Sequence, residues 1–107
     1  MNAWIYLAAA IVLEILATTL LKLSDGFAKW YWGVLSIALY SACFWVLAPA
    51  LKTLPVGVVY AIWSGAGIVA ITIIGAFFFD ERLAALQFFF IAMILIGAMG
   101  LQLTTQA

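Results

Sequence analysis

Eight charged residues divide this chain into long apolar stretches, and their spacing constrains the fold more than any other feature. Residues 30–51 and 53–79 carry no charge, and none follows Arg82 before the C-terminus. About 20 consecutive apolar residues suffice for a helix to cross the hydrocarbon core of a bilayer. These stretches all reach that length, and so do residues 3–21, although they include Glu14. The charge spacing therefore predicts four transmembrane helices, near residues 3–22, 31–51, 56–79 and 84–104.

The composition excludes most alternatives to a membrane protein. Of the 107 residues, 70% are hydrophobic and 7% charged, the formal net charge is zero, and there is no histidine and a single cysteine. A chain this short could not bury so much apolar surface in water. Neither a soluble enzyme, a nucleic-acid binder nor a His/Cys metal site is expected. We therefore predict an all-α integral membrane protein, with one four-helix domain over residues 1–107 and no metal or other cofactor.

The orientation in the membrane is only weakly encoded. The first and third predicted loops would place Lys22, Lys29 and Arg82 on one side, against Lys52 on the other. Three side-chain cations against one is a slim positive-inside bias. A fixed topology and insertion in both orientations are therefore both compatible with the sequence.

Glu14 is the strongest functional signal in the sequence. It lies near the middle of the first predicted span, where an ionisable group costs about 2.5 kcal/mol or more and typically marks an ion or substrate pathway. A permanent ion pair is the alternative, but Lys22 is eight residues away, about 12 Å along a helix. Helical spacing puts several side chains on the same face as Glu14, namely Leu7, Ala10, Ile11, Thr18 and Leu21.

The third span carries a second candidate cluster. Tyr60, Trp63 and Ser64 share one helical face, and aromatic faces bind organic cations through cation–π attraction. Ordinary helix packing is the alternative interpretation. Gly65 and Gly67 indicate either a bend or a close helix contact.

The second and fourth spans contribute further candidates. Tyr40 and Phe44 share a face of the second span with Cys43. Tyr40 could line a cavity or form a hydrogen bond within the bundle, whereas Cys43 is expected to be a small apolar packing residue. Gly97 lies among small and large apolar residues of the uncharged fourth span, which favours a role in self-association.

One membrane carboxylate per chain suggests that the working unit is a homo-oligomer, most simply a dimer. Inverted pairing of two chains would give the in-plane two-fold symmetry that many transporters obtain from internal repeats. A site that binds either protons or a cation, but not both, would couple the two fluxes. No Walker-type ATP motif is present, so the proton gradient is the expected energy source.

Several segments resemble the small multidrug resistance family across all four spans. They are Trp4-Ile5-Tyr6-Leu7, Glu14 followed by Thr18-Thr19 and Leu21-Lys22, Ser24-Asp25-Gly26-Phe27, Thr53-Leu54-Pro55-Val56-Gly57 and Tyr60-Ala61-Ile62-Trp63-Ser64-Gly65-Ala66-Gly67. The resemblance implies an antiparallel, dual-topology homodimer in the bacterial inner membrane, which exports aromatic and quaternary ammonium cations in exchange for protons. It also implies that Glu14 binds protons and substrate competitively.

The resemblance extends the residue assignments. The predicted proton- and substrate-binding set is Trp4, Leu7, Ala10, Ile11, Glu14, Thr18, Tyr40, Phe44, Tyr60, Trp63 and Ser64. Gly65 and Gly67 are predicted to bend the third span, and Gly97 to contact the partner chain. The sequence departs from the family's pattern at Trp4 (tyrosine in multidrug exporters), at Ala17 (glycine), at Cys43 (serine) and at Phe90 (often glycine). The change at Cys43 weakens the expectation that this position donates a hydrogen bond.

Two alternatives stay open. Guanidinium exporters of the same family usually carry a tryptophan shortly after the membrane glutamate, whereas this chain has Ile15-Leu16-Ala17-Thr18. That difference favours the multidrug branch. Alternatively, the chain is a non-transporting membrane subunit in which Glu14 is a polar docking contact for a different protein.

Overall fold

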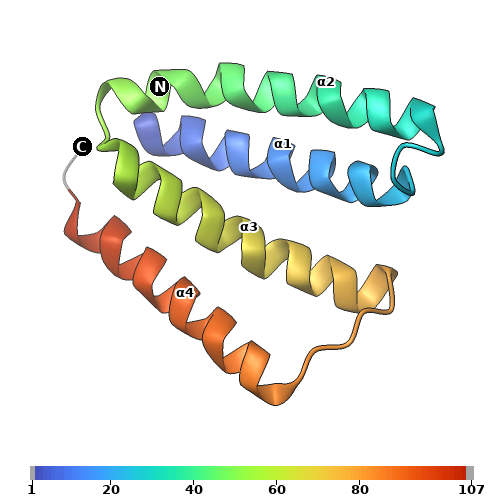
Figure 1. Ribbon diagram of the computed structural model, residues 1–107. Helices are drawn as coiled ribbons and strands as arrows, with labels where there is room; N and C mark the ends of the chain where they lie inside the picture. The colour runs from blue at the N-terminus through green and yellow to red at the C-terminus, as the bar shows by residue number, and fades with distance from the viewer. Residues whose placement is uncertain (1, 106–107) are drawn as a thin grey trace. The chain divides into compact units, whose positions relative to one another are not determined.

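Four long helices account for most of the chain. The computed structural model describes residues 2–105. The helices are α1 (Ala3–Leu23), α2 (Trp30–Leu47), α3 (Val56–Phe78) and α4 (Ala85–Thr104), with a short 3₁₀ helix, η1 (Ala48–Lys52), directly after α2 (Figure 1). All four spans are long and apolar enough to cross a membrane. The prediction of an all-α protein with four membrane-spanning helices is confirmed.

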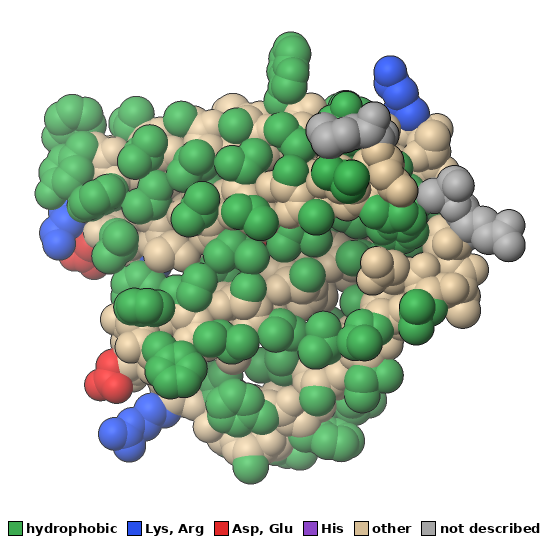
Figure 2. Space-filling model, turned by 180° about the vertical axis from the view of Figure 1, so that it is seen from behind, with side chains coloured by type: hydrophobic (Ala, Val, Ile, Leu, Met, Phe, Trp, Pro, Cys, Tyr) green, Lys and Arg blue, Asp and Glu red, His purple; other side chains and the backbone are tan. Residues whose placement is uncertain are grey.

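The chain divides into two compact units. Unit 1 is residues 1–53, with α1, α2 and η1, and unit 2 is residues 54–107, with α3 and α4. Hydrophobic side chains cover the visible helix surfaces, and charged side chains gather at helix ends (Figure 2). The single four-helix domain and the antiparallel homodimer stay predictions.

Proline explains the end of α2. The predicted span ran to residue 51, whereas the α-helix ends at Leu47 and η1 completes the span to Lys52. Pro49 has no N–H to donate to the carbonyl four residues earlier, so the α-helical pattern cannot continue through it. Pro55 has an extended backbone, with φ −60° and ψ 139°, and immediately precedes α3.

Unit 1 is an antiparallel helical hairpin held together along two stripes of mostly small residues. The buried residues of α1 are Leu7, Ala10 and Ala17. Those of α2 are Gly33, Ser36, Cys43 and Leu47. Both sets recur at intervals of three, four or seven residues, so each lies along one helix face. Small side chains on both faces let the two backbones approach closely.

The loop between α1 and α2 is tightly ordered by its own hydrogen bonds. Ser24 is fully buried, and its hydroxyl donates to the Leu21 carbonyl at 2.6 Å and accepts from the Phe27 N–H at 3.2 Å. Asp25, Gly26 and Phe27 all have positive φ. A Cβ on Gly33 would collide with the Phe27 ring. The absent side chain of Gly33 therefore leaves the space in which Phe27 rests.

In unit 2, α3 and α4 form a second antiparallel hairpin. A Cβ on Gly65 would lie 3.0 Å from the Ala98 Cβ and 3.4 Å from Ile94. Gly65 is therefore a close-contact point between α3 and α4. At the other end, the Glu81 N–H donates to the Gly75 carbonyl at 3.0 Å, which turns the chain away from α3.

Candidate functional site

Glu14 occupies the middle of α1 and is held by a residue one turn away. The Thr18 hydroxyl donates to Oε1 of Glu14 at 3.1 Å. The other oxygen, Oε2, is buried and has no hydrogen-bond partner among the described residues. A buried acceptor with no donor is energetically costly unless something else satisfies it. The site therefore leaves one carboxylate oxygen available for a proton or a cation.

Thr18 also connects Glu14 to α2. Its Oγ1 lies 2.5 Å from the Tyr40 hydroxyl oxygen, and either group could donate in that pair. An ionised carboxylate only accepts hydrogen bonds, and a threonine hydroxyl carries a single proton. When Glu14 is ionised, the Thr18 hydroxyl therefore donates its hydrogen bond to Glu14, and the Tyr40 hydroxyl donates to Thr18. The three side chains form one directed chain from α2 to the carboxylate.

Two interhelical hydrogen bonds flank this chain. The Ser36 hydroxyl donates to the Ala17 carbonyl at 2.6 Å, and the Cys43 thiol donates to the Ala10 carbonyl at 3.2 Å. Ala17 lies three residues after Glu14 and Ala10 four residues before it, so the bonds hold α2 against α1 on both sides of the carboxylate. The hairpin is therefore fixed in register at the level of Glu14.

The same two hydrogen bonds involve two residues that the sequence analysis singled out. Cys43 is buried as predicted, but it donates a hydrogen bond as well as packing. Ala10, predicted as a binding-site residue beside Glu14, is fully buried at the point where Cys43 contacts the backbone. Its small side chain therefore permits close approach of α2.

The remaining predicted residues of α1 differ in exposure. Leu7 is buried, with 2% of its surface exposed, whereas Trp4 and Ile11 are half-buried. The Trp4 N–H is bonded to Oδ1 of Asn2 at 2.8 Å, which caps the start of α1. Within unit 1, Thr18 and Tyr40 are thus the predicted residues that join Glu14 in one hydrogen-bonded network.

The predicted aromatic cluster of α3 is present within unit 2. The rings of Tyr60 and Trp63 are 6.2 Å apart at 73°, an edge-to-face arrangement, and Tyr60 is 65% exposed. Ser64 is half-buried one residue further on. The helix is continuous from Val56 to Phe78 and so passes through Gly65 and Gly67 without a break. The predicted bend at these glycines stays a prediction.

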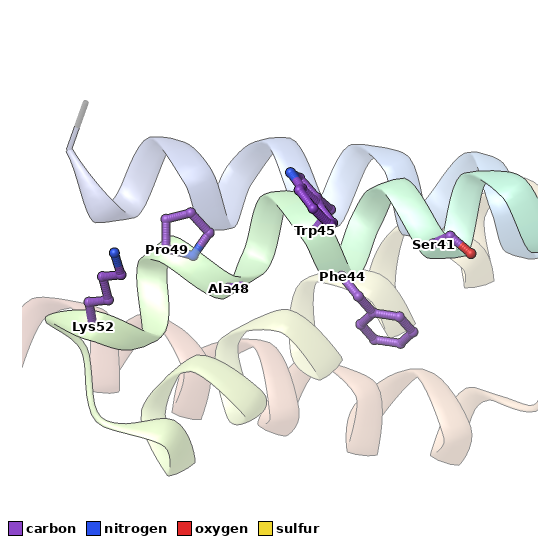
Figure 3. Close-up of a pocket in the computed structure, with 6 residues that line it drawn as sticks. All are labelled: Ser41, Phe44, Trp45, Ala48, Pro49 and Lys52. Carbon is purple, nitrogen blue, oxygen red and sulfur yellow. The ribbon is translucent and has the colours of Figure 1, made fainter.

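Phe44 and Gly97 are both exposed. Phe44 borders an open groove of about 540 Å³ on one face of α2 and η1 (Figure 3), lined by Ser41, Phe44, Trp45, Ala48, Pro49 and Lys52. A Cβ on Gly97 would meet no atom within 4 Å. Gly97 therefore leaves α4 open to close approach by another helix, and its predicted role as a dimer contact stays a prediction.

Two features were not predicted from the sequence. They are the hydrogen bonds that Ser36 and Cys43 donate to α1, and the groove on α2 and η1. Ser36 and Cys43 lie seven residues apart on α2, and such a spacing places two polar side chains on one helix face. That spacing was a usable signal for Ser36. The groove had no comparable signal, because it depends on how Trp45 and Phe44 project from the helix.

Comparison with known proteins identifies the family. The Small Multidrug Resistance protein family model matches residues 2–94. The chain is 48% identical to the multidrug transporter EmrE of Escherichia coli strain K12 over 83 residues, which cover 78% of this chain and 76% of the relative. It is 41% identical over 107 residues to the multidrug transporter PA4990 of Pseudomonas aeruginosa, covering 100% of this chain and 97% of the relative.

A third relative is named for resistance to quaternary ammonium compounds. The chain is 40% identical over 107 residues to the quaternary ammonium compound-resistance protein QacE of Escherichia coli, covering 100% of this chain and 97% of the relative. Four membrane-spanning helices and bacterial relatives support a multi-pass protein of the bacterial inner membrane. The resemblance predicted from the sequence is confirmed, and the chain belongs to the small multidrug resistance family.

Proposed function

We propose that this chain exports lipophilic aromatic and quaternary ammonium cations across the inner membrane in exchange for protons, and that it is a transporter rather than an enzyme. The observation that carries the proposal is Glu14. Its carboxylate lies in the middle of a membrane span, with Oε1 bonded to Thr18 and Oε2 buried without a hydrogen-bond partner among residues 2–105. The names of the relatives EmrE and QacE support the substrate class.

Competition for one carboxylate provides the coupling. An ionised Glu14 attracts a cation, whereas a protonated Glu14 does not, so a proton entering from one side displaces the cation. Within unit 2, Tyr60 and Trp63 provide a second feature that suits organic cations, because aromatic rings attract cations without a fixed hydrogen-bond pattern. Alternating access of this site to the two sides of the membrane then carries cations outward.

The proposed transporter is a homodimer. One chain contributes a single membrane carboxylate, and two antiparallel copies would supply two. In this arrangement Gly97 on α4 contributes to the contact between copies, since its surface is open to close approach.

The proposal is tested by measuring electrical currents in proteoliposomes. We expect a quaternary ammonium ion to evoke a current with the wild-type protein, and Glu14→Gln to abolish it because the amide carries no charge. Glu14→Asp should retain transport with an altered pH dependence. Asp25→Asn is the matched control, since it removes an exposed carboxylate from the α1–α2 loop of the same unit.

The other outcomes separate the alternatives. A current with guanidinium alone would assign the chain to the guanidinium exporters. Full activity in Glu14→Gln would overturn the coupling role of the carboxylate. No current with either cation, from protein that is folded and helical, would support a non-transporting partner subunit instead.

A further inference from the structure

The groove on α2 and η1 has the form of a binding site for an elongated molecule. Its lining residues fall into two rows with a four-residue period, Ser41-Trp45-Pro49 and Phe44-Ala48-Lys52. Residues four apart lie above one another on an α-helix, so Ser41 with Trp45 and Phe44 with Ala48 form two neighbouring ridges along α2. The 3₁₀ helix η1, with three residues per turn, continues this surface to Pro49 and Lys52. Figure 3 shows Phe44 and Trp45 projecting from α2 in different directions, with Ala48 adding almost no side chain between them and Lys52. The groove therefore runs along the helix and ends at a lysine.

The polarity of the groove changes along its length. Away from Lys52, the Ser41 hydroxyl donates to the Ile37 carbonyl of its own helix at 3.0 Å, so it is already occupied. The next turn exposes the large apolar surfaces of Phe44 (54% exposed) and Trp45 (84% exposed). Lys52 lies seven residues beyond Trp45, roughly 12 Å further along the axis at the rises of an α-helix and a 3₁₀ helix. A lysine in this position extends its ammonium group toward the headgroup region.

The charges of unit 1 leave Lys52 suited to an external anion. The acidic residues of this unit are Glu14 and Asp25. Glu14 lies in the middle of α1, and Asp25 lies in the loop at the opposite end of α2 from η1. Within the described part of unit 1, Lys52 forms no ion pair. Its ammonium group is therefore available to a negatively charged partner at the edge of the bilayer.

We propose that this groove binds one anionic phospholipid, with the phosphate paired to Lys52 and an acyl chain lying over Ala48 between Phe44 and Trp45. A phospholipid carries a phosphate and an apolar chain in the order in which the groove presents a cation and an apolar channel. A soluble phosphate would leave the apolar part of the groove unfilled. The proposal needs only that the spans lie in a bilayer, and it is independent of cation export.

The test measures which lipid contacts Trp45. The purified protein is placed in bilayers with bromine on the acyl chains of either phosphatidylglycerol or phosphatidylcholine, at equal mole fraction. Bromine quenches nearby tryptophan fluorescence, and subtracting the signal of Trp45→Phe isolates the contribution of Trp45. One lysine near an anionic membrane surface corresponds to about a fivefold preference for the anionic lipid.

Three variants separate the headgroup contact from general attraction. We expect Lys52→Gln to abolish the preference, and Ala48→Leu to reduce it by filling the groove while keeping the charge. Lys29→Gln, which removes an exposed cation at the opposite end of α2, should keep the preference. Circular dichroism checks that every variant retains its helices.

Several results would overturn the proposal. Equal quenching by the two lipids, or a preference that survives Lys52→Gln, would exclude a lysine–phosphate contact. A preference that survives Ala48→Leu would show that Lys52 attracts headgroups without the groove. No quenching of Trp45 by either lipid would show that protein, such as a second copy, covers the groove. Glu14→Gln should leave the lipid preference intact, so this test and the export test can fail separately.

Discussion

Thr18 provides the sharpest test of the geometry around Glu14. Its hydroxyl donates to Oε1 at 3.1 Å, while Oε2 has no hydrogen-bond partner among the described residues. Thr18→Val keeps the shape of the side chain but removes the donor to Oε1, so neither carboxylate oxygen then has a hydrogen-bond donor among the described residues. A cation binds the ionised form of Glu14. A hydrogen-bond donor stabilises this ionised form more than it stabilises the protonated form.

The magnitude follows from the cost of one lost donor. Hydrogen bonds to charged groups contribute about 1.5–3 kcal/mol in soluble proteins, and interhelical hydrogen bonds in membranes average about 0.6 kcal/mol with a maximum near 1.7. A loss of roughly 1–2 kcal/mol lies between these values and corresponds to a five- to thirtyfold weaker affinity. We therefore expect Thr18→Val to raise the Kd for tetraphenylphosphonium by that factor at fixed pH, and Thr18→Ser to stay close to the wild type.

Tyr40→Phe tests the direction of the hydrogen-bond chain. It removes the group that donates to Thr18 but leaves the bond from Thr18 to Glu14 in place, so its effect on affinity should be smaller than that of Thr18→Val. Isothermal titration calorimetry in detergent measures all three variants under one set of conditions. Wild-type affinity in Thr18→Val, or a larger loss in Tyr40→Phe than in Thr18→Val, would refute this reasoning.

Three further predictions concern the packing of the two hairpins. Ser36→Ala removes an interhelical hydrogen bond and should lower the stability of unit 1 by about 0.6–1.7 kcal/mol, measured by denaturant titration of the helical signal in mixed micelles; an unchanged midpoint would contradict this. Gly33→Ala should destabilise the protein because its Cβ collides with the ring of Phe27, and Phe27→Ala should restore part of the lost stability in the double variant. Gly65→Val should separate α3 from α4 at Ala98 and lower the thermal unfolding temperature, whereas the same change at an exposed position of α4 should not.

The sequence predicts the helices well because the membrane itself sets their length. Four long apolar stretches separated by turn residues leave little choice of span, and no observed helix end differs from the predicted one by more than four residues. The early end of α2 follows from Pro49, whose effect on hydrogen bonding is local. The proximity of Thr18 to Glu14 is also local, since four residues make one helical turn.

The contacts between helices are less accessible to sequence reasoning. Nothing in the sequence fixes which residue of α2 lies level with Glu14, because sliding one helix by a turn would preserve both apolar patterns. The register follows instead from hydrogen bonds such as that of Ser36 to the Ala17 carbonyl. Backbone carbonyls have no sequence signature, so such a bond is visible only once the two helices are placed together.

The chain of hydrogen bonds from Tyr40 through Thr18 to Glu14 links the protonation of Glu14 on α1 to a side chain of α2. When Glu14 is protonated, its own hydroxyl can donate to Thr18, which then turns its proton toward Tyr40. The phenol is released from donating, and its proton can point elsewhere. Protonation of Glu14 on α1 thus allows the direction of donation to reverse along the chain of hydrogen bonds. The last group of this chain, the Tyr40 hydroxyl, belongs to α2. The protonation state of Glu14 therefore determines the orientation of a hydroxyl hydrogen on α2, and this change requires no movement of the backbone.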